Sequence, residues 1–200
     1  AVGQYHPGMP RGRKRDENAR RRILDAAFEL VGSSGQGTVT INDIAASANV
    51  AKQTIYRWWP SRTAVILDAL VVGSMKATPF KQTDDVRADF RTHLRGVIRL
   101  FNSPTGSLIR ELVAASQADD DIAEEFRTRF WAPRRELSLL QLRRGIEGGQ
   151  IRSDVDVEAV LDAIYGPLWL RMMIGHIPLN QRNADSILDV IWPGIAVPTS

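Results

Sequence analysis

The sequence predicts an all-α protein built from a small basic head and a larger helical body. Apolar residues recur with the three-to-four-residue period of amphipathic helices along most of the chain, and no useful stretch shows the alternation of a strand. Glycine, serine and proline interrupt this period where short loops would join helices. With 44% hydrophobic and 24% charged residues, the 200-residue chain has the composition of a globular protein with room for a module and a core.

Charge is distributed unevenly along the chain. Through Arg62 there are ten basic and five acidic residues, whereas the remainder has 16 basic and 18 acidic residues. This pattern is typical of a polyanion-binding head on a body with another task, although a solvated basic tail would give the same count.

The composition also bears on the location of the protein. Because the chain has no cysteine, a disulfide framework, a thiolate metal site and a cysteine nucleophile are excluded. No apolar run approaches the roughly 20 residues that span a bilayer, and the basic N-terminus lacks the apolar stretch of a secretory signal. We therefore expect a cytoplasmic protein without a membrane segment, and we leave residues 1–8 out of the fold prediction.

Residues 16–34 predict the first helix. Ile23, Ala27, Leu30 and Val31 share one face, arginines occupy the other, and the run GSSGQG ends the helix. The basic segment before it, residues 1–15, predicts a flexible arm.

A short second helix follows Thr40, which forms a capping box with Asp43. Asn49 then suits a tight turn, because asparagine tolerates the left-handed backbone conformation. The inner face of this helix is expected to consist of Ile41, Ile44, Ala45 and Ala48.

The third helix is predicted over residues 51–59, since Pro60 ends it and Ser61 caps a fourth helix that runs to about residue 75. Two helices joined by such a tight turn form a helix-turn-helix, which offers its second helix to a DNA major groove. Adjacent helical residues point about 100° apart, so Trp58 and Trp59 cannot both face the core. We expect Trp59 to point inward, because it lies four residues after Ile55, and Trp58 to point outward.

The exposed face of the third helix carries side chains suited to DNA. Lys52 and Gln53 are types that hydrogen-bond base edges, while Tyr56, Arg57 and Trp58 can contact phosphates. The alternative is that these aromatic residues cover a neighbouring helix of a plain bundle. In the arm, Arg11 and Arg13 would enter a narrow minor groove or form a solvated tail.

All segments after residue 80 also predict helices. They lie within 84–101, 105–117, 119–151 with a kink at Pro133 and an end at Gly148-Gly149, 156–176 interrupted at Gly166-Pro167, and 183–196 interrupted at Pro193-Gly194. The expected domains are the arm at 1–15, the DNA-binding domain at 16–62, and a helical body at 63–200.

Several segments of the chain resemble the Tet-repressor (TetR) family of bacterial transcriptional regulators. The resemblance lies in RRRILDAAFELV and in TINDIAASANVAKQTIYRWWPSRTAVILDAL, and YGPLWLRMMIGHIPL resembles a large C-terminal subgroup more weakly. Asn49, Ala51, Trp59 and Arg62 depart from the usual residues, and Ala51 stands where a hydroxyl cap is usual. The resemblance implies DNA contacts by Thr40, Lys52, Gln53, Thr54, Tyr56, Trp58 and Arg62. The resemblance also implies that residues 63–200 form an effector-binding and dimerisation domain.

The body is expected to hold an effector pocket between the helices of residues 84–176. Large, adaptable apolar side chains and a few polar ones could surround a ligand there, on helices broken at Pro104, Pro133 and Pro167, although each is individually more typical of plain core. The candidates are Phe90, His93, Leu94, Arg110, Phe130, Trp131, Trp169, Met172, Met173 and His176.

A single recognition helix reads few base pairs, so a homodimer on a near-palindromic operator is expected. Residues 156–196 are the predicted interface, although a monomer could use the same side chains as core. The apolar candidates for this contact are Ala159, Ile164, Leu168, Ile187, Val190 and Ile191.

Together with this resemblance, these patterns predict a ligand-responsive repressor that requires no cofactor. An enzyme is disfavoured, because the three histidines are scattered and HExxH, GxSxG, GxGxxG and phosphate-loop motifs are missing. The acidic run at residues 119–125 is better explained by a helix N-terminus than by a metal site. A helical binding or scaffold module without DNA function is the alternative, and DNA retention that falls steeply with salt would separate the two.

Overall fold

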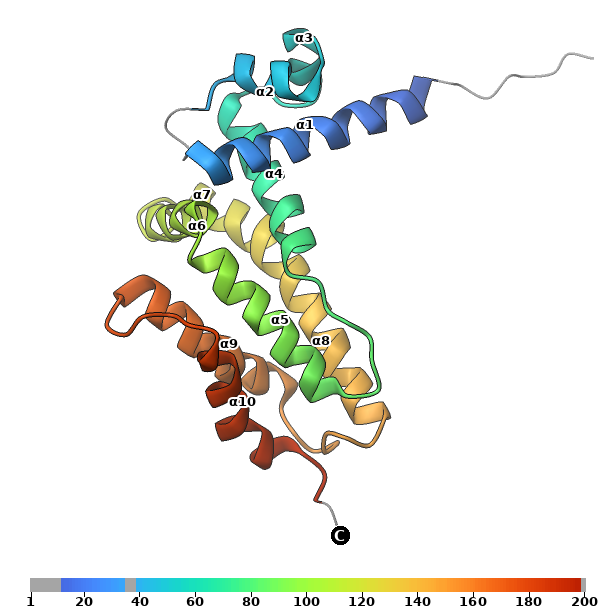
Figure 1. The fold of residues 1–200 in the computed structure, drawn as a ribbon, viewed down its shortest axis with the longest axis vertical. Helices are drawn as coiled ribbons and strands as arrows, with labels where there is room; N and C mark the ends of the chain where they lie inside the picture. The colour runs from blue at the N-terminus through green and yellow to red at the C-terminus, as the bar shows by residue number, and fades with distance from the viewer. Residues whose placement is uncertain (1–11, 35–38, 199–200) are drawn as a thin grey trace, which may run out of the picture. The chain divides into compact units, whose positions relative to one another are not determined.

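The computed structural model describes residues 12–34 and 39–198 (Figure 1). The chain divides into two compact units, the first ending at Leu70 and the second beginning at Val71, and each is considered by itself below. Over the described ranges the regular secondary structure is helical, with one isolated antiparallel bridge between Ile151 and Ala196. The predicted all-α class is therefore confirmed. No helix in these ranges is long and apolar enough to cross a membrane.

In its described part, the first unit, called the head, contains three complete helices and the start of a fourth. They are α1 (Gly12–Ser34), α2 (Ile41–Ala48), α3 (Lys52–Tyr56) and α4 (Arg62–Ala77). The expected arm was too long, because α1 begins at Gly12 and so includes residues 12–15. Arginine and lysine are good helix formers, which lets the helix extend toward the N-terminus. Arg11 lies outside the described residues.

The predicted local structure around α2 is confirmed. The Thr40 hydroxyl accepts a hydrogen bond from the Asp43 amide, and the Asp43 carboxylate accepts one from the Thr40 amide at 2.8 Å. Asn49 adopts the left-handed conformation, with φ of 52° and ψ of 55°. The four residues that we placed on the inner face are all buried: Ile41, Ile44, Ala45 and Ala48.

Helix α3 is shorter than predicted. It spans Lys52–Tyr56, and Arg57 and Trp58 form a turn instead of continuing it to residue 59. The amides of Trp58 and Trp59 both donate to the Ile55 carbonyl, which tightens the end of the helix. Because the residue before a proline is disfavoured in the α conformation, Pro60 ends the helix earlier than the apolar spacing alone suggests.

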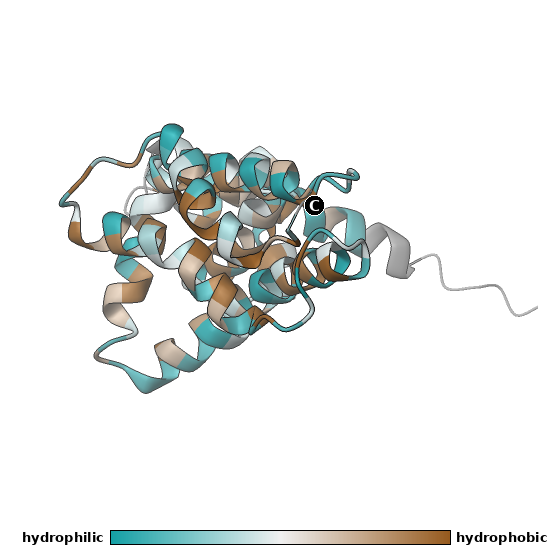
Figure 2. Ribbon diagram, turned by 90° about the horizontal axis from the view of Figure 1, so that it is seen from below, coloured by the Kyte–Doolittle hydropathy of each residue, from teal (hydrophilic) through white to brown (hydrophobic). Residues whose placement is uncertain are grey.

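The second unit, called the body, begins at Val71 and is built from the end of α4 and six further α-helices with a π-helical turn, η1. Helix α5 contacts α6, α8 and α10, and α9 contacts α8 and α10 (Figure 1). Hydrophilic and hydrophobic residues mix along these helices, as expected for helices with one buried face (Figure 2). The elements are α5 (Val86–Phe101), α6 (Pro104–Ala115), α7 (Asp120–Glu125), η1 (Phe126–Trp131), α8 (Ala132–Glu147), α9 (Val157–Ile174) and α10 (Arg182–Ile195).

Prolines act differently from our prediction at two positions. Helix α9 runs on through Pro167 and α10 runs on through Pro193, so the expected interruptions there are wrong. A proline removes one backbone donor, but the bonds on either side can maintain the helix. Pro133 does disturb the α-helical ladder, because η1 directly precedes the first turn of α8 in which it lies. Pro104 occupies the first turn of α6, where its missing donor costs little.

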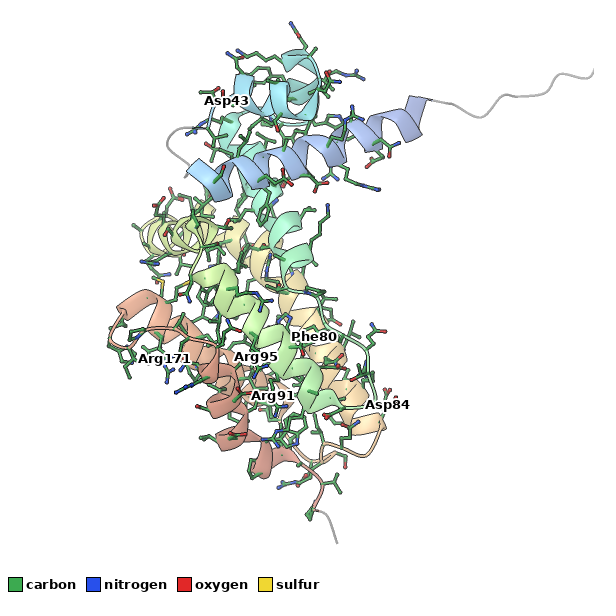
Figure 3. All side chains as sticks on the ribbon, viewed as in Figure 1. Asp43, Phe80, Asp84, Arg91, Arg95 and Arg171 are labelled. Carbon is green, nitrogen blue, oxygen red and sulfur yellow. The ribbon has the colours of Figure 1, made fainter. Side chains whose placement is uncertain are left out.

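A buried carboxylate fixes the segment between α4 and α5. Asp89 is 1% exposed and accepts hydrogen bonds from Arg144 Nη2 at 2.6 Å, Gln141 Nε2 at 2.9 Å and the Thr83 amide at 3.0 Å. Burial would raise the pKa of Asp89, but these donors outweigh it and hold the pKa below its usual value. The network ties the connecting segment at Thr83 to α5 and α8. Phe80 and Asp84 of the same segment are labelled in Figure 3.

Candidate DNA-binding surface and body cavity

The head exposes most of the side chains that the sequence predicted for DNA. Lys52, Gln53 and Arg57 are exposed, Tyr56 is 48% exposed, and Trp58 is 38% exposed. The Lys52 ammonium lies 5.9 Å from the centre of the Tyr56 ring, so the two form one surface at α3. Thr54 is half-buried on the same helix, Thr40 is exposed at the start of α2, and the side chain of Arg13 is not among those described.

The two adjacent tryptophans point in opposite directions, as we predicted. Trp59 is 3% exposed, and its indole Nε1 donates to Asp68 Oδ2 at 2.7 Å. Trp58 is exposed next to it, with ring centres 6.3 Å apart. Trp59 therefore anchors the end of α3 in the core of the head and presents Trp58 outward.

Arg20 of α1 supports this pair, a role that sequence reasoning missed. Its guanidinium lies 5.9 Å from the Trp58 ring centre and 5.8 Å from that of Trp59, and Nη2 is 3.8 Å from Asp68. Helical spacing placed this arginine on the polar face of the first helix. The contact depends on how α1 packs against the turn after α3, and nothing local in the sequence signals it.

Four polar side chains of the head hold its backbone together. Arg22 donates to the Ala48 carbonyl at 3.2 Å and so satisfies the end of α2, while Arg62 donates to the Val39 carbonyl at 2.8 Å. Thr40 and Asp43 form the capping box, whose hydrogen bonds lower the pKa of Asp43. Arg62 and Thr40, both predicted to touch DNA, thus also position α2.

The body contains a cavity of about 70 Å³. Its walls come from α4, the segment after it, α5, η1, α8 and α9, so residues distant in sequence meet there. The lining residues are mainly apolar: Met75, Thr78, His93, Val97, Leu100, Phe101, Phe130, Trp131, Arg134, Arg135, Leu137, Ser138, Leu161, Tyr165 and Trp169.

Four of the ten residues that we proposed for a pocket line this cavity, namely His93, Phe130, Trp131 and Trp169. The other six do not. Phe90, Leu94 and Met172 are buried in the core, Met173 is half-buried elsewhere, and Arg110 and His176 are exposed. Helical spacing identified apolar residues, but it did not indicate which of them leave space unfilled.

Arg134 is the most unusual polar group of the cavity. Nη1 donates to the Phe130 carbonyl at 2.8 Å, and Nη2 donates to the Val71 carbonyl at 3.0 Å and to the Ser74 hydroxyl. The guanidinium carbon lies 3.7 Å from the Phe130 ring centre. Burial without a neighbouring carboxylate lowers the pKa of Arg134 to about 10.

Two neutral groups lie near it. His93 stacks on Phe80 with ring centres 3.9 Å apart, burial lowers its pKa to about 4, and its Nδ1 has no hydrogen-bond partner among the described residues. The Tyr165 hydroxyl is 2.9 Å from the Ser138 hydroxyl, and burial raises the pKa of Tyr165. At neutral pH both rings are therefore uncharged, and Arg134 and Arg135 are the ionised lining groups.

The acidic run at residues 119–125 caps and stabilises a helix. Asp119 caps α7 by accepting hydrogen bonds from the amides of Asp121 and Ile122, and Glu124 pairs with Arg127 at 2.8 Å. Among the described residues, no group of carboxylates and histidines is arranged to hold a metal ion.

The expected dimer residues fall into two groups. Ile164, Leu168 and Ile187 are buried within the body itself, so they serve as core and not as an interface. Ala159 is exposed, Ile191 is half-buried, and Val190 is 82% exposed. Large apolar side chains that the prediction omitted are also exposed on α9, where Leu170 is 55% and Ile174 is 67% exposed.

Comparison with known proteins gives matches over nearly the whole chain. A family model described as "Bacterial regulatory proteins, tetR family" matches residues 23–69, and one described as "Tetracyclin repressor-like, C-terminal domain" matches residues 80–191.

Individual relatives give the same result. An uncharacterised HTH-type transcriptional regulator, YdeS of Bacillus subtilis, is 40% identical over 92% of this chain and 93% of its own length. The DNA-binding transcriptional repressor TetR of Mycobacteroides abscessus is 26% identical over 90% of this chain and 97% of its own. The crystal structure of the TetR family regulator SCO0332 has a TM-score of 0.79 and 33% identity, covering 90% of this chain and all of that one.

Proposed function

Because this chain belongs to the TetR family and is a DNA-binding transcriptional repressor, we propose that it binds a near-palindromic operator as a homodimer and leaves it when a small molecule occupies the body cavity. The observation that carries the DNA part is the exposed surface of α3. Lys52 and Gln53 read base edges there, while Tyr56, Arg57 and Trp58 hold phosphates. Repression of transcription would place its action in the cytoplasm.

Variants of α3 test these roles. Lys52→Ala or Gln53→Ala should remove about 1 to 3 kcal/mol of discrimination at particular base pairs, because each side chain reads a base. Tyr56→Phe should weaken binding to all sequences alike, because it removes a phosphate contact and leaves the base contacts. Fluorescence anisotropy with the operator and single-base variants measures both effects. Equal losses on every sequence for all three variants would contradict the assignment.

The homodimer is proposed to form through α9 and α10. Leu170, Ile174 and Val190 support this choice, because they are large apolar side chains exposed on these two helices, and Leu170 and Ile174 lie one helical turn apart. Along α9, Ala159, Ala163 and Gly166 are exposed on the same side, and such small residues let a partner helix approach closely. A two-fold pairing of these helices would place two heads on half-sites one or more DNA turns apart.

Sedimentation tests the dimer. Val190→Asp should convert the protein to single chains at micromolar concentration, because it places a charge in an apolar contact. Leu140→Asp on α8 is the matched control, since Leu140 is 52% exposed but lies on another helix. A wild-type mass of one chain would disprove the proposed assembly, and dissociation by the control alone would move the interface to α8.

The cavity is proposed as the effector site. It combines aromatic walls with a few polar groups, which is the usual composition of a small-molecule site. A ligand releases DNA only if it prefers the conformation that cannot bind the operator, and about 3 kcal/mol of preference weakens operator binding roughly 150-fold.

Variants of Trp169 and Met173 test whether ligand-induced release depends on the residues that line the cavity. Trp169→Ala should blunt ligand-induced release while leaving the DNA affinity of the unliganded protein near normal, because Trp169 is a wall of the cavity. Met173→Ala should have little effect on release, because Met173 does not line it. Compounds that raise thermal stability but never change operator affinity would contradict the regulatory role.

A further inference from the structure

The charge of Arg134 is not neutralised by the protein around it. None of the described carboxylates forms an ion pair with this guanidinium, whose hydrogen bonds go to two carbonyl groups and one hydroxyl. The neighbouring Arg135 is different, since it donates to Asp162 at 3.0 Å and also binds Glu158. Arg134 is half-buried, and a cation withdrawn from water without a counter-charge is costly, so it is rarely retained for stability alone.

We propose that the cavity binds a small organic acid, with its anionic oxygen accepting a hydrogen bond from Arg134 and its apolar body lying against Trp131 and Trp169. The inference rests on the proposed role of the cavity as the effector site and names the class of effector.

The arginine has donors left for such a ligand. A guanidinium carries five N–H groups, and Arg134 uses one on Nη1 and two on Nη2. The Nε hydrogen and one Nη1 hydrogen are therefore not used by the described protein groups. The Phe130 ring and the two carbonyl acceptors already hold the guanidinium in place, so little side-chain entropy is lost when an anion binds.

The other polar groups of the cavity fit an acid better than a base. His93 and Tyr165 are neutral at pH 7, and Arg135 is already paired with two carboxylates. A cationic ligand would meet the uncompensated charge of Arg134 without a carboxylate to offset it. His93 Nδ1, which lacks a partner among the described residues, remains for a second polar group of the acid.

The size of the cavity limits the body of the acid. A cavity of about 150 Å³ accepts benzene in another protein, whereas this one measures about 70 Å³. A ligand with one ring therefore fits only if side chains such as Trp131 and Trp169 move. That movement gives the ligand a preference between two conformations of the body, which regulation requires.

Matched ligands test the charge requirement. Benzoate, phenylacetate and 3-phenylpropionate are titrated into the full-length protein beside their primary amides, which have similar shape but no charge. Tryptophan fluorescence and calorimetry give the dissociation constants. We expect the best acid to bind at least about tenfold more tightly than its amide, because hydrogen bonds to charged groups are the stronger ones. Equal affinity of acids and amides, or no binding of any acid at millimolar concentration, would overturn the proposal.

Variants locate the charge. Arg134→Gln should remove the preference for acids while leaving the affinity for the amides within about threefold, and Arg134→Lys, which keeps the charge, should retain part of the preference. Arg127→Gln is the control, because it removes a cation from η1 at an exposed site outside the cavity. An acid preference that survives Arg134→Gln, or that disappears only in Arg135→Gln, would refute the assignment to Arg134.

Operator binding separates this inference from the proposed function. Acids that bind in an Arg134-dependent way without releasing DNA would support the acid site and contradict its regulatory role. Release of DNA by neutral compounds, with no advantage for their acids, would support the effector cavity and overturn the acid site.

Discussion

The head and the body hold their functional cations in opposite ways. Lys52 and Arg57 of the head are exposed at the two ends of a short helix, whereas the Arg134 guanidinium of the body lies in a cavity wall, against the Phe130 ring and two backbone carbonyls. Exposed cations attract a polyanion over a distance but are weakened by salt. A half-buried cation in a cavity is screened less by salt and suits a single small anion. The comparison suggests that one chain uses the same type of charge for two partners by changing only its burial.

Salt provides the largest test of this contrast. Raising salt from about 50 to 200 mM should lower operator affinity about 10³-fold, because a dimer with six or more phosphate contacts displaces that many counterions. Binding of the best acid in the cavity should change less than about threefold, because a buried pair is poorly screened. Anisotropy and calorimetry over the same salt series measure both. Parallel losses for the two ligands would show that the acid binds at an exposed site.

The adjacent tryptophans of the head sharpen the same contrast between exposed and buried groups. Trp59→Ala should cost about 3 to 5 kcal/mol in the free energy of unfolding, because it empties a core position and removes the hydrogen bond to Asp68. Trp58→Ala should cost about 1 kcal/mol or less, mainly through its contact with Arg20, yet it should weaken operator binding. Urea unfolding followed by circular dichroism gives both values. Similar costs for the two variants would mean that Trp58 is also a core residue.

Most features of the head could be predicted from the sequence because they depend on near neighbours. The capping box of Thr40 and Asp43, the left-handed Asn49 and the inward Trp59 each follow from residues within four positions. The predicted end of α3 at residue 59 was wrong. The helix ends at Tyr56, because Pro60 disfavours the α conformation in the residue before it. Arg20 was missed as a support of Trp58, because that contact joins residues far apart in the chain.

The body could be predicted only as a set of helices. Its helical class and most helix positions follow from periodicity, but Pro167 and Pro193 show that a proline in the pattern need not end a helix. The cavity depends on how several helices pack together, and the apolar period within one helix carries no information about that packing. The sequence pattern does not single out Arg134, because only its lack of an acidic partner in three dimensions distinguishes it from Arg135.

His93 tests burial in the body through pH. Its pKa in the folded protein is about 4, below the usual 6.5, so between these values the unfolded chain binds a proton that the folded chain does not. Stability should therefore fall as the pH drops, by about 2 kcal/mol from this group between pH 7 and pH 5. Urea unfolding of the wild type and of His93→Gln, which cannot titrate there, isolates the effect. The same pH dependence in both proteins would show that His93 is accessible to protons.

The smallest expected effect concerns a missing cap in the head. Ala51 precedes α3 with φ of −72° and ψ of 145°, the extended conformation of a capping residue, but its side chain makes no hydrogen bond. Ala51→Ser should raise the free energy of unfolding by about 0.5 to 1 kcal/mol, because its hydroxyl can accept a hydrogen bond from a free amide of the first turn. Ala46→Ser, at an exposed position inside α2, is the control and should be neutral or slightly destabilising. Because the same hydroxyl would stand on the exposed end of α3, it should also strengthen binding to all DNA sequences alike. A gain in stability without any change in DNA affinity would place residue 51 away from the phosphates and narrow the contact surface to the residues from Lys52 onward.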